Sequence, residues 1–281
     1  MILSTMTYEE IYREIKNDFR DVLDYYNKTL KPKVCKEALR CPQNLYPWRK
    51  FDYYTHPTSK NKYVFFSIVK KHSLWKKPEP TVFCEYEGKG GKEIITAAIW
   101  KDRRTFQPTL IISVFQAHFF KRYQERFIKK DELEVDKIPI FLARNVGAIQ
   151  ISSDAVSAKE LLKDEPGYNN TALLNLDGLC LGKVSIENHN IIIYKTFIPF
   201  DELFWKQNEK VLPEYLRMLA DQGATDYPQC RERIYTIYNE SAKRQNDILL
   251  GDNPMSREER LQAYLKEYRT TCHELIKYVI R

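Results

Sequence analysis

Three basic side chains share one edge of a helix predicted over residues 116–130. His118, Arg122 and Arg126 stand at positions i, i+4 and i+8, so they stack along the helix axis. Arginine binds a phosphodiester through paired N–H donors and stabilises the extra negative charge of its transition state. Histidine transfers protons near neutral pH. This combination suits metal-free RNA cleavage, in which the 2′-hydroxyl attacks the neighbouring phosphorus.

The opposite side of this helix is aromatic, with Phe119, Phe120, Tyr123 and Phe127. A second interpretation is therefore an amphipathic helix whose polar face lies in water. Lys121 and Glu125 would then form a simple i, i+4 ion pair, and His118 would cap or pack the helix start. The residues by themselves leave both interpretations open.

Strands must position this helix. Runs rich in β-branched and aromatic residues predict strands over residues 62–70, 81–86, 94–100 and 109–115, the last leading directly into the helix. A three-stranded antiparallel meander is predicted over 171–176, 179–186 and 191–198, with tight turns at Asp177-Gly178 and 187–190. In the last strand, alternation predicts that Tyr194 and Thr196 share one face while Lys195 points the other way.

Helices flank these strands. Thr7 with Glu10, and Ser256 with Glu259, have the spacing of a capping box. Apolar periodicity predicts helices over 5–30, 212–222, 227–250 and 256–280, and residues 31–60 are expected to form an irregular, aromatic-packed connection.

Grouped strands indicate an α+β fold with a central, mostly antiparallel sheet and an inserted helix. The expected regions are 1–60, an α+β core at 61–204 and a helical region at 205–281, or one compact unit.

The strand, the helix and the following meander resemble the barnase/EndoU/colicin/RelE-like ribonuclease superfamily. Small toxin-like members of that group have a helix of the form His-Ala-x2-Arg-x2-Glu-Arg. This chain has Ala117-His118, then Arg122 and Glu125-Arg126, so the order matches although the spacing differs. The likeness covers residues 109–198. The terminal helical regions have no counterpart in it.

The resemblance implies a cleft between sheet and helix. His118 would be the acid or base, Arg122 and Arg126 would bind phosphate, and Tyr194 or Thr196 would contribute from the last strand. Further basic and aromatic residues near the helix would suit a single-stranded nucleic acid: Lys121, Tyr123, Arg103 and Arg104. Core aromatics beside solvated lysines are the alternative explanation of that neighbourhood.

Composition limits the partners, the location and the cofactors that we expect. The 281 residues carry a net charge of +7, which fits a phosphate-bearing partner or ordinary solubility charge. The chain starts with no export signal, and no run approaches the roughly 20 apolar residues of a membrane span, so a cytoplasmic protein without a membrane partner is expected. The six cysteines fit no zinc spacing, so neither metal nor cofactor is expected.

The working hypothesis is a metal-independent, ribonuclease-like protein that acts on RNA, or binds it in a catalytically inactive form. One alternative is a non-enzymatic nucleic-acid-binding or mobile-element accessory protein that uses the same basic face. Another is a protein-interaction scaffold with a partner on the C-terminal helices.

Overall fold

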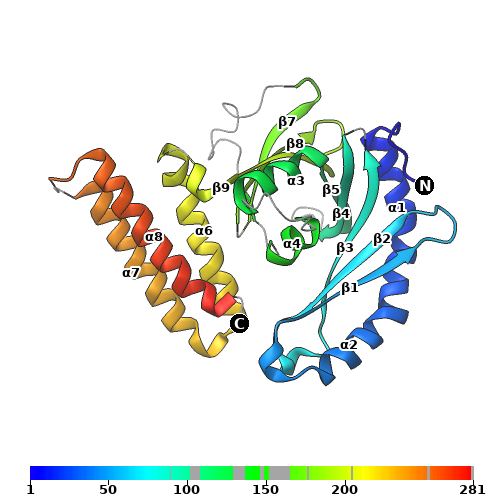
Figure 1. Ribbon diagram of the computed structural model, residues 1–281, viewed down its shortest axis with the longest axis horizontal. Coiled ribbons are helices and arrows are strands. Elements are labelled where there is room, and N and C mark those ends of the chain that lie inside the picture. The colour runs from blue at the N-terminus through cyan, green and yellow to red at the C-terminus, as the bar shows by residue number, and fades with distance from the viewer. Residues whose placement is uncertain are drawn as a thin grey trace.

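In the part of the chain that the computed structural model describes, the strands form one nine-stranded sheet (Figure 1). The structure describes residues 1–88, 90–101, 108–128, 137–145, 149–151, 165–175, 177–203, 205–251 and 254–279. Within those ranges, no helix combines the length and apolar character needed to cross a membrane.

The elements follow one another along the chain as helices, strands, a short helical insertion, more strands and a helical end. The helices are α1 (Tyr8–Tyr25), α2 (Lys31–Arg40), α3 (Ala117–Tyr123), α4 (Lys137–Arg144), α6 (Trp205–Asp226), α7 (Arg231–Leu250) and α8 (Arg257–Val279). The strands are β1 (Trp48–Thr55), β2 (Lys62–Val69), β3 (Glu79–Gly88), β4 (Gly91–Lys101), β5 (Pro108–Phe115), β6 (Ile149–Ile151), β7 (Tyr168–Leu174), β8 (Gly178–Ser185) and β9 (Ile191–Pro199).

The strands lie in the order β1-β2-β3-β4-β5-β9-β8-β7-β6. All of these neighbours pair antiparallel except β5 and β9, which run parallel, with Ile112–Phe115 beside Ile191–Tyr194. Two antiparallel groups, one from each half of the chain, therefore meet at a single parallel seam.

Helices cover both faces of this sheet (Figure 1). On one face, α1 packs over β2 to β5 and β9, with Ile11, Ile15, Phe65, Ile95, Val114 and Ile193 in the shared core. On the other face, α3 and α4 pack through Phe119, Phe120, Phe141, Phe115, Tyr194 and Phe197. The C-terminal helices form a third core against β7, β8 and the end of β9, with Leu174, Leu181, Ile198, Leu216, Tyr264 and Leu275.

The predicted α+β class is confirmed, as are the strands, the meander and both capping boxes. The irregular connection expected at 31–60 is wrong, because this stretch contains α2 and the edge strand β1. β1 pairs with β2 along its whole length, so the aromatic residues between 48 and 55 belong to the sheet.

A buried carboxylate ties α1 to the β1–β2 hairpin. Asp18 Oδ2 accepts hydrogen bonds from Ser59 Oγ (2.6 Å), Asn61 Nδ2 (2.7 Å) and Tyr63 Oη (2.8 Å). Asp18 is only 4% exposed, so these donors replace the water that the carboxylate loses on folding. Ionised acceptors form stronger hydrogen bonds than neutral ones, which makes Asp18 the main polar link between helix and hairpin.

We expect Asp18→Asn to lower the free energy of unfolding by about 1–2 kcal/mol, because a neutral amide oxygen accepts hydrogen bonds from the three donors more weakly than a carboxylate oxygen does. Urea denaturation followed by circular dichroism measures this loss. Asp24→Asn, on the exposed side of the same helix, is the matched control and should change stability little. An equal denaturation midpoint for Asp18→Asn and the wild type would contradict the assignment.

Candidate functional site

The aromatic side chains of α3, the helix that carries the predicted site, anchor it to the sheet. Phe119, Phe120 and Tyr123 are at most 1% exposed and pack against β5, β9 and α4. At the helix start, the backbone N–H of Gln116 donates to the carbonyl of Tyr194, 3.2 Å away. This packing fixes the rotation of α3 on the sheet and directs its opposite side toward solvent.

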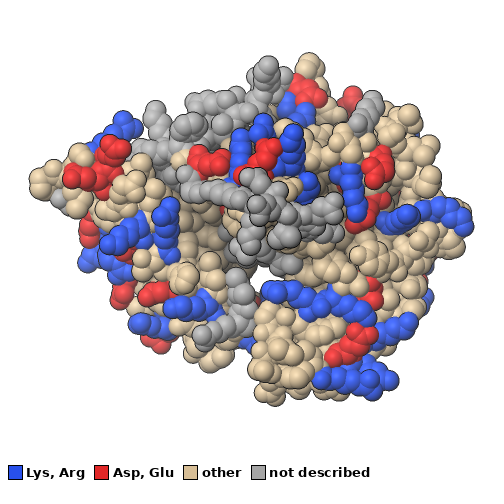
Figure 2. All heavy atoms as spheres, in the orientation of Figure 1, with Lys and Arg blue, Asp and Glu red and all other residues tan. Residues whose placement is uncertain are grey.

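His118 and Arg122 are brought together on that outer side. Arg122 Nε donates to His118 Nε2 at 3.3 Å, and Arg122 Nη1 donates to Glu125 Oε2 at 3.0 Å. His118 and Glu125 are exposed, and Lys121 Nζ lies 3.9 Å from Glu125 Oε1. Figure 2 shows Lys and Arg side chains interleaved with acidic ones over α3. The result is an exposed polar cluster with a guanidinium at its centre, which we call the α3 edge (His118, Lys121, Arg122 and Glu125).

Arg126 departs from this edge, so the predicted alignment of three basic residues is wrong in its last member. The α-helix ends at Tyr123 and the chain continues as a π turn from Gln124 to Ile128, which winds more residues into each turn. Arg126 is thereby rotated toward β9, where Nη1 donates to the Phe197 carbonyl at 3.0 Å and Nε lies 3.5 Å from Glu202 Oε2.

Arg126 also lines a cavity of about 550 Å³ between the π turn and the C-terminal helices, together with Arg269 and His273 of α8. Asp177 lines the same cavity and Glu202 lies against Arg126, so its charge is mixed. Arg126 therefore links the π turn to the end of β9 in this structure.

Thr196 does not face α3. β9 carries a bulge, because Gly182 pairs with Tyr194 and Leu181 with Thr196, which leaves Lys195 as an extra residue. The extra residue reverses the alternation, so Thr196 lies on the side of Leu181, which packs in the core of the C-terminal helices. The expectation that Tyr194 and Thr196 share one face is wrong for this reason.

Tyr194 and Tyr123 are core residues. Tyr194 is 1% exposed and stacks on Phe115, with ring centroids 4.9 Å apart. Tyr123 is fully buried, and its hydroxyl donates to Asp177 Oδ2 at 2.7 Å. Neither ring can stack on a base from solvent, so their predicted role in substrate binding is corrected to packing. Arg103 and Arg104 lie outside the described residues.

A buried carboxyl near the start of α3 escaped the sequence analysis. Glu93 of β4 is 6% exposed and accepts a hydrogen bond from Tyr86 Oη. Burial raises the pKa of Glu93, and the hydrogen bond from Tyr86 opposes that rise. Tyr8 of α1 is nearby and accepts from Gln116 Nε2 at 2.7 Å; burial raises its pKa as well, with the charge of Glu93 adding to the effect. Glu93 follows a turn in a charged stretch, so no sequence signal marks it as buried.

Comparison with protein-family models, with curated proteins and with solved structures finds no match. The ribonuclease resemblance, the nucleic-acid and protein partners and the cytoplasmic location therefore stay predictions. Among the described residues, no group of three or more His, Cys, Asp or Glu side chains is arranged to hold a metal ion. The groups that the α3 edge itself presents are the imidazole of His118, the guanidinium of Arg122, the ammonium of Lys121 and the carboxylate of Glu125.

The raised pKa of Glu93 predicts a pH dependence of stability. A folded-state pKa above the unfolded one stabilises the protein at low pH, and this contribution is lost as pH rises from about 4.5 through the folded value. We expect Glu93→Gln, which keeps an acceptor for Tyr86, to flatten this decline and to raise the free energy of unfolding at pH 7. Urea denaturation at several pH values between 4 and 7 measures the free energy of unfolding of both proteins.

Glu87→Gln is the control, since Glu87 is exposed in the same hairpin and should leave the pH profile unchanged. A Glu93→Gln profile that parallels the wild type over the whole range would show that Glu93 is not the group responsible.

Proposed function

We propose that the α3 edge binds the phosphate backbone of RNA and that the protein is a metal-independent, ribonuclease-like protein. The observation that carries this proposal is the position of Arg122 between His118 and Glu125. A guanidinium held on two sides loses less side-chain entropy when it binds an oxyanion than a free one does.

Arg122 keeps donors for a ligand. Its Nε donates to His118 and its Nη1 donates to Glu125, and the described contacts assign no partner to Nη2. The Arg122 side chain is 40% exposed, so a ligand can reach it from solvent. Nη2 can donate two N–H groups to phosphate oxygens. Lys121, with its side chain 69% exposed, adds a second positive charge along the same edge.

His118 supplies the proton-transfer group. Because its Nε2 accepts from Arg122, that nitrogen carries no proton in this arrangement. When the contact from Arg122 Nε opens, Nε2 is free to take the proton of a 2′-hydroxyl, while the contact with Glu125 still holds Arg122 toward the phosphate. The 2′-oxygen then bonds to phosphorus, the bond to the 5′-oxygen breaks, and that oxygen takes a proton from water. The product is a cyclic phosphate.

Binding without cleavage is the second candidate. The observation in its favour is the exposure of His118, because strong electrostatic catalysis needs a site from which water is excluded. Both candidates use the same Arg122 and differ only in whether His118 changes the RNA.

We expect Arg122→Ala to weaken binding of a fluorescent single-stranded RNA by roughly tenfold at low salt, the effect of one charge-assisted contact to phosphate. His118→Ala should abolish cleavage of the same RNA while changing its affinity less. Fluorescence anisotropy measures the binding, and gel analysis with EDTA present measures the cleavage.

Arg217→Ala is a matched control, because Arg217 is exposed on α6 and pairs with Glu214 three residues away, as Arg122 pairs with Glu125 in the opposite order. It should bind and cleave like the wild type. Cleavage that survives in His118→Ala would refute the catalytic role, and equal RNA affinity for Arg122→Ala and Arg217→Ala would refute the binding site.

A further inference from the structure

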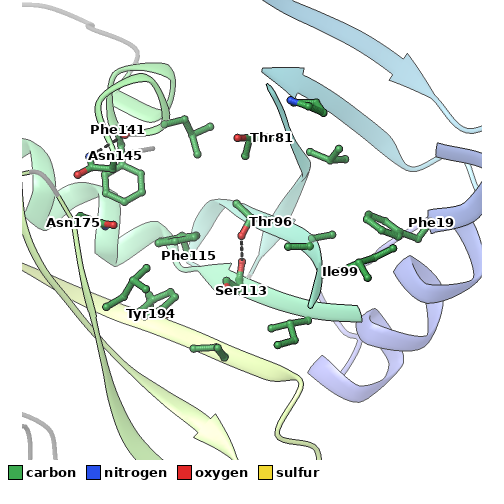
Figure 3. Close-up of a pocket in the computed structure, with 18 of the residues that line it drawn as sticks. Phe19, Thr81, Thr96, Ile99, Ser113, Phe115, Phe141, Asn145, Asn175 and Tyr194 are labelled. Carbon is green, nitrogen blue, oxygen red and sulfur yellow. Dashed lines mark hydrogen bonds between the residues drawn. The ribbon is translucent and has the colours of Figure 1, made fainter. Parts of the chain in front are cut away.

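A cavity of about 510 Å³ lies between the sheet and α4, separate from the α3 edge (Figure 3). Its walls come from β3, β4, β5, β7, β9 and α4, with Phe19 and Leu23 of α1 at one end. Its volume is in the range of small-molecule sites, which are about 300–1,000 Å³.

The cavity exists because two neighbouring strands separate. β3 and β4 pair only as far as Val82 and Ala97, whereas β4 continues beside β5 to Lys101. The residues beyond that point on each strand, Thr81 and Ile99, line the opening between them (Figure 3). Ile99 is 51% exposed, so an apolar side chain stands at the cavity in contact with solvent.

A buried polar atom points into this space. Asn175, at the end of β7, is 2% exposed, and its Oδ1 is buried without a hydrogen-bond partner. Its donors are occupied: Nδ2 donates to Cys180 Sγ at 2.9 Å, and the backbone N–H donates to the Gly178 carbonyl at 2.9 Å. Figure 3 shows the Asn175 oxygen directed toward the side of Phe115. An acceptor that is buried and unpaired costs free energy that a bound donor would recover.

The rest of the wall is uncharged. The described lining residues include the rings of Phe115, Phe141 and Tyr194 and the hydroxyls of Thr81 and Ser113, and none of them is ionisable as an acid or a cation near neutral pH. The neighbouring Asn145 cannot compete for a ligand, because its amide is bonded to the Phe141 carbonyl and to Asp177. An ion would lose its hydration here with no opposite charge to replace it.

We propose that this cavity binds an uncharged, mostly apolar ring compound that donates a hydrogen bond to Asn175 Oδ1. The aromatic walls contact the ring, and Asn175 fixes its orientation. This site is independent of RNA binding at the α3 edge.

Indole and indene test the proposal, since they have the same bicyclic shape and only indole carries an N–H donor. We expect indole to bind the unsubstituted protein about fivefold more tightly than indene, the effect of one neutral hydrogen bond. Ligand-observed NMR titration measures both dissociation constants. Asn175→Leu should remove the difference by weakening indole binding alone, and Ser113→Phe, which fills the cavity, should block both compounds.

The comparison of the two compounds needs only the unsubstituted protein, so it stands even if Asn175→Leu does not fold. Equal affinity for indole and indene would overturn the role of Asn175. Failure of both compounds to bind would overturn the proposal that the cavity is a ligand site. Binding that persists in folded Ser113→Phe would place the ligand elsewhere and would also overturn the proposal.

Discussion

The parallel pairing of β5 with β9 is the constraint on which the rest of the structure depends. It joins residues almost eighty positions apart, and it is where the two antiparallel halves of the sheet become one. The paired segments are apolar on both faces, with Ile112, Val114, Ile191 and Ile193 under α1 and Phe115, Ile192 and Tyr194 under α3 and α4. Parallel strands need both faces covered, and α1 on one face with α3 and α4 on the other meets that need.

The position of the α3 edge follows from this seam. Because α3 starts directly after β5, it lies over β9 and turns its aromatic side into the core. Its polar side is thereby exposed as a consequence of packing. The π turn then ends the regular helix, so that Arg126 bonds to Phe197 while His118 and Arg122 stay together outside. One local change in helical winding thus separates Arg126, which bonds to the sheet, from Arg122, which we propose binds phosphate.

The two proposed sites lie on opposite sides of the same packing layer. Phe115 stacks on Tyr194 and also lines the cavity, while the helix that follows Phe115 carries the α3 edge. The edge offers charge in water, where the proposed binding of phosphate would be sensitive to salt. The cavity offers apolar walls and one oriented acceptor, which suit the shape and the donor of the proposed ring compound.

The sequence by itself determined most of the elements, with α2 and β1 as exceptions, because capping boxes, strand-forming runs and turn residues act over a few neighbouring positions. Thr7 with Glu10 started α1, and Asp177-Gly178 joined two strands of the meander as expected. Tertiary structure decided what depends on distant partners: the parallel seam, β1 at the sheet edge and the burial of Glu93. It also decided which candidate residues stay together. The bulge at Lys195 moved Thr196 away from α3, the π turn moved Arg126 away from His118, and core packing enclosed Tyr123 and Tyr194. One extra residue in a strand or one wider helical turn reverses a side chain's direction, and an idealised period of two or 3.6 residues cannot anticipate either.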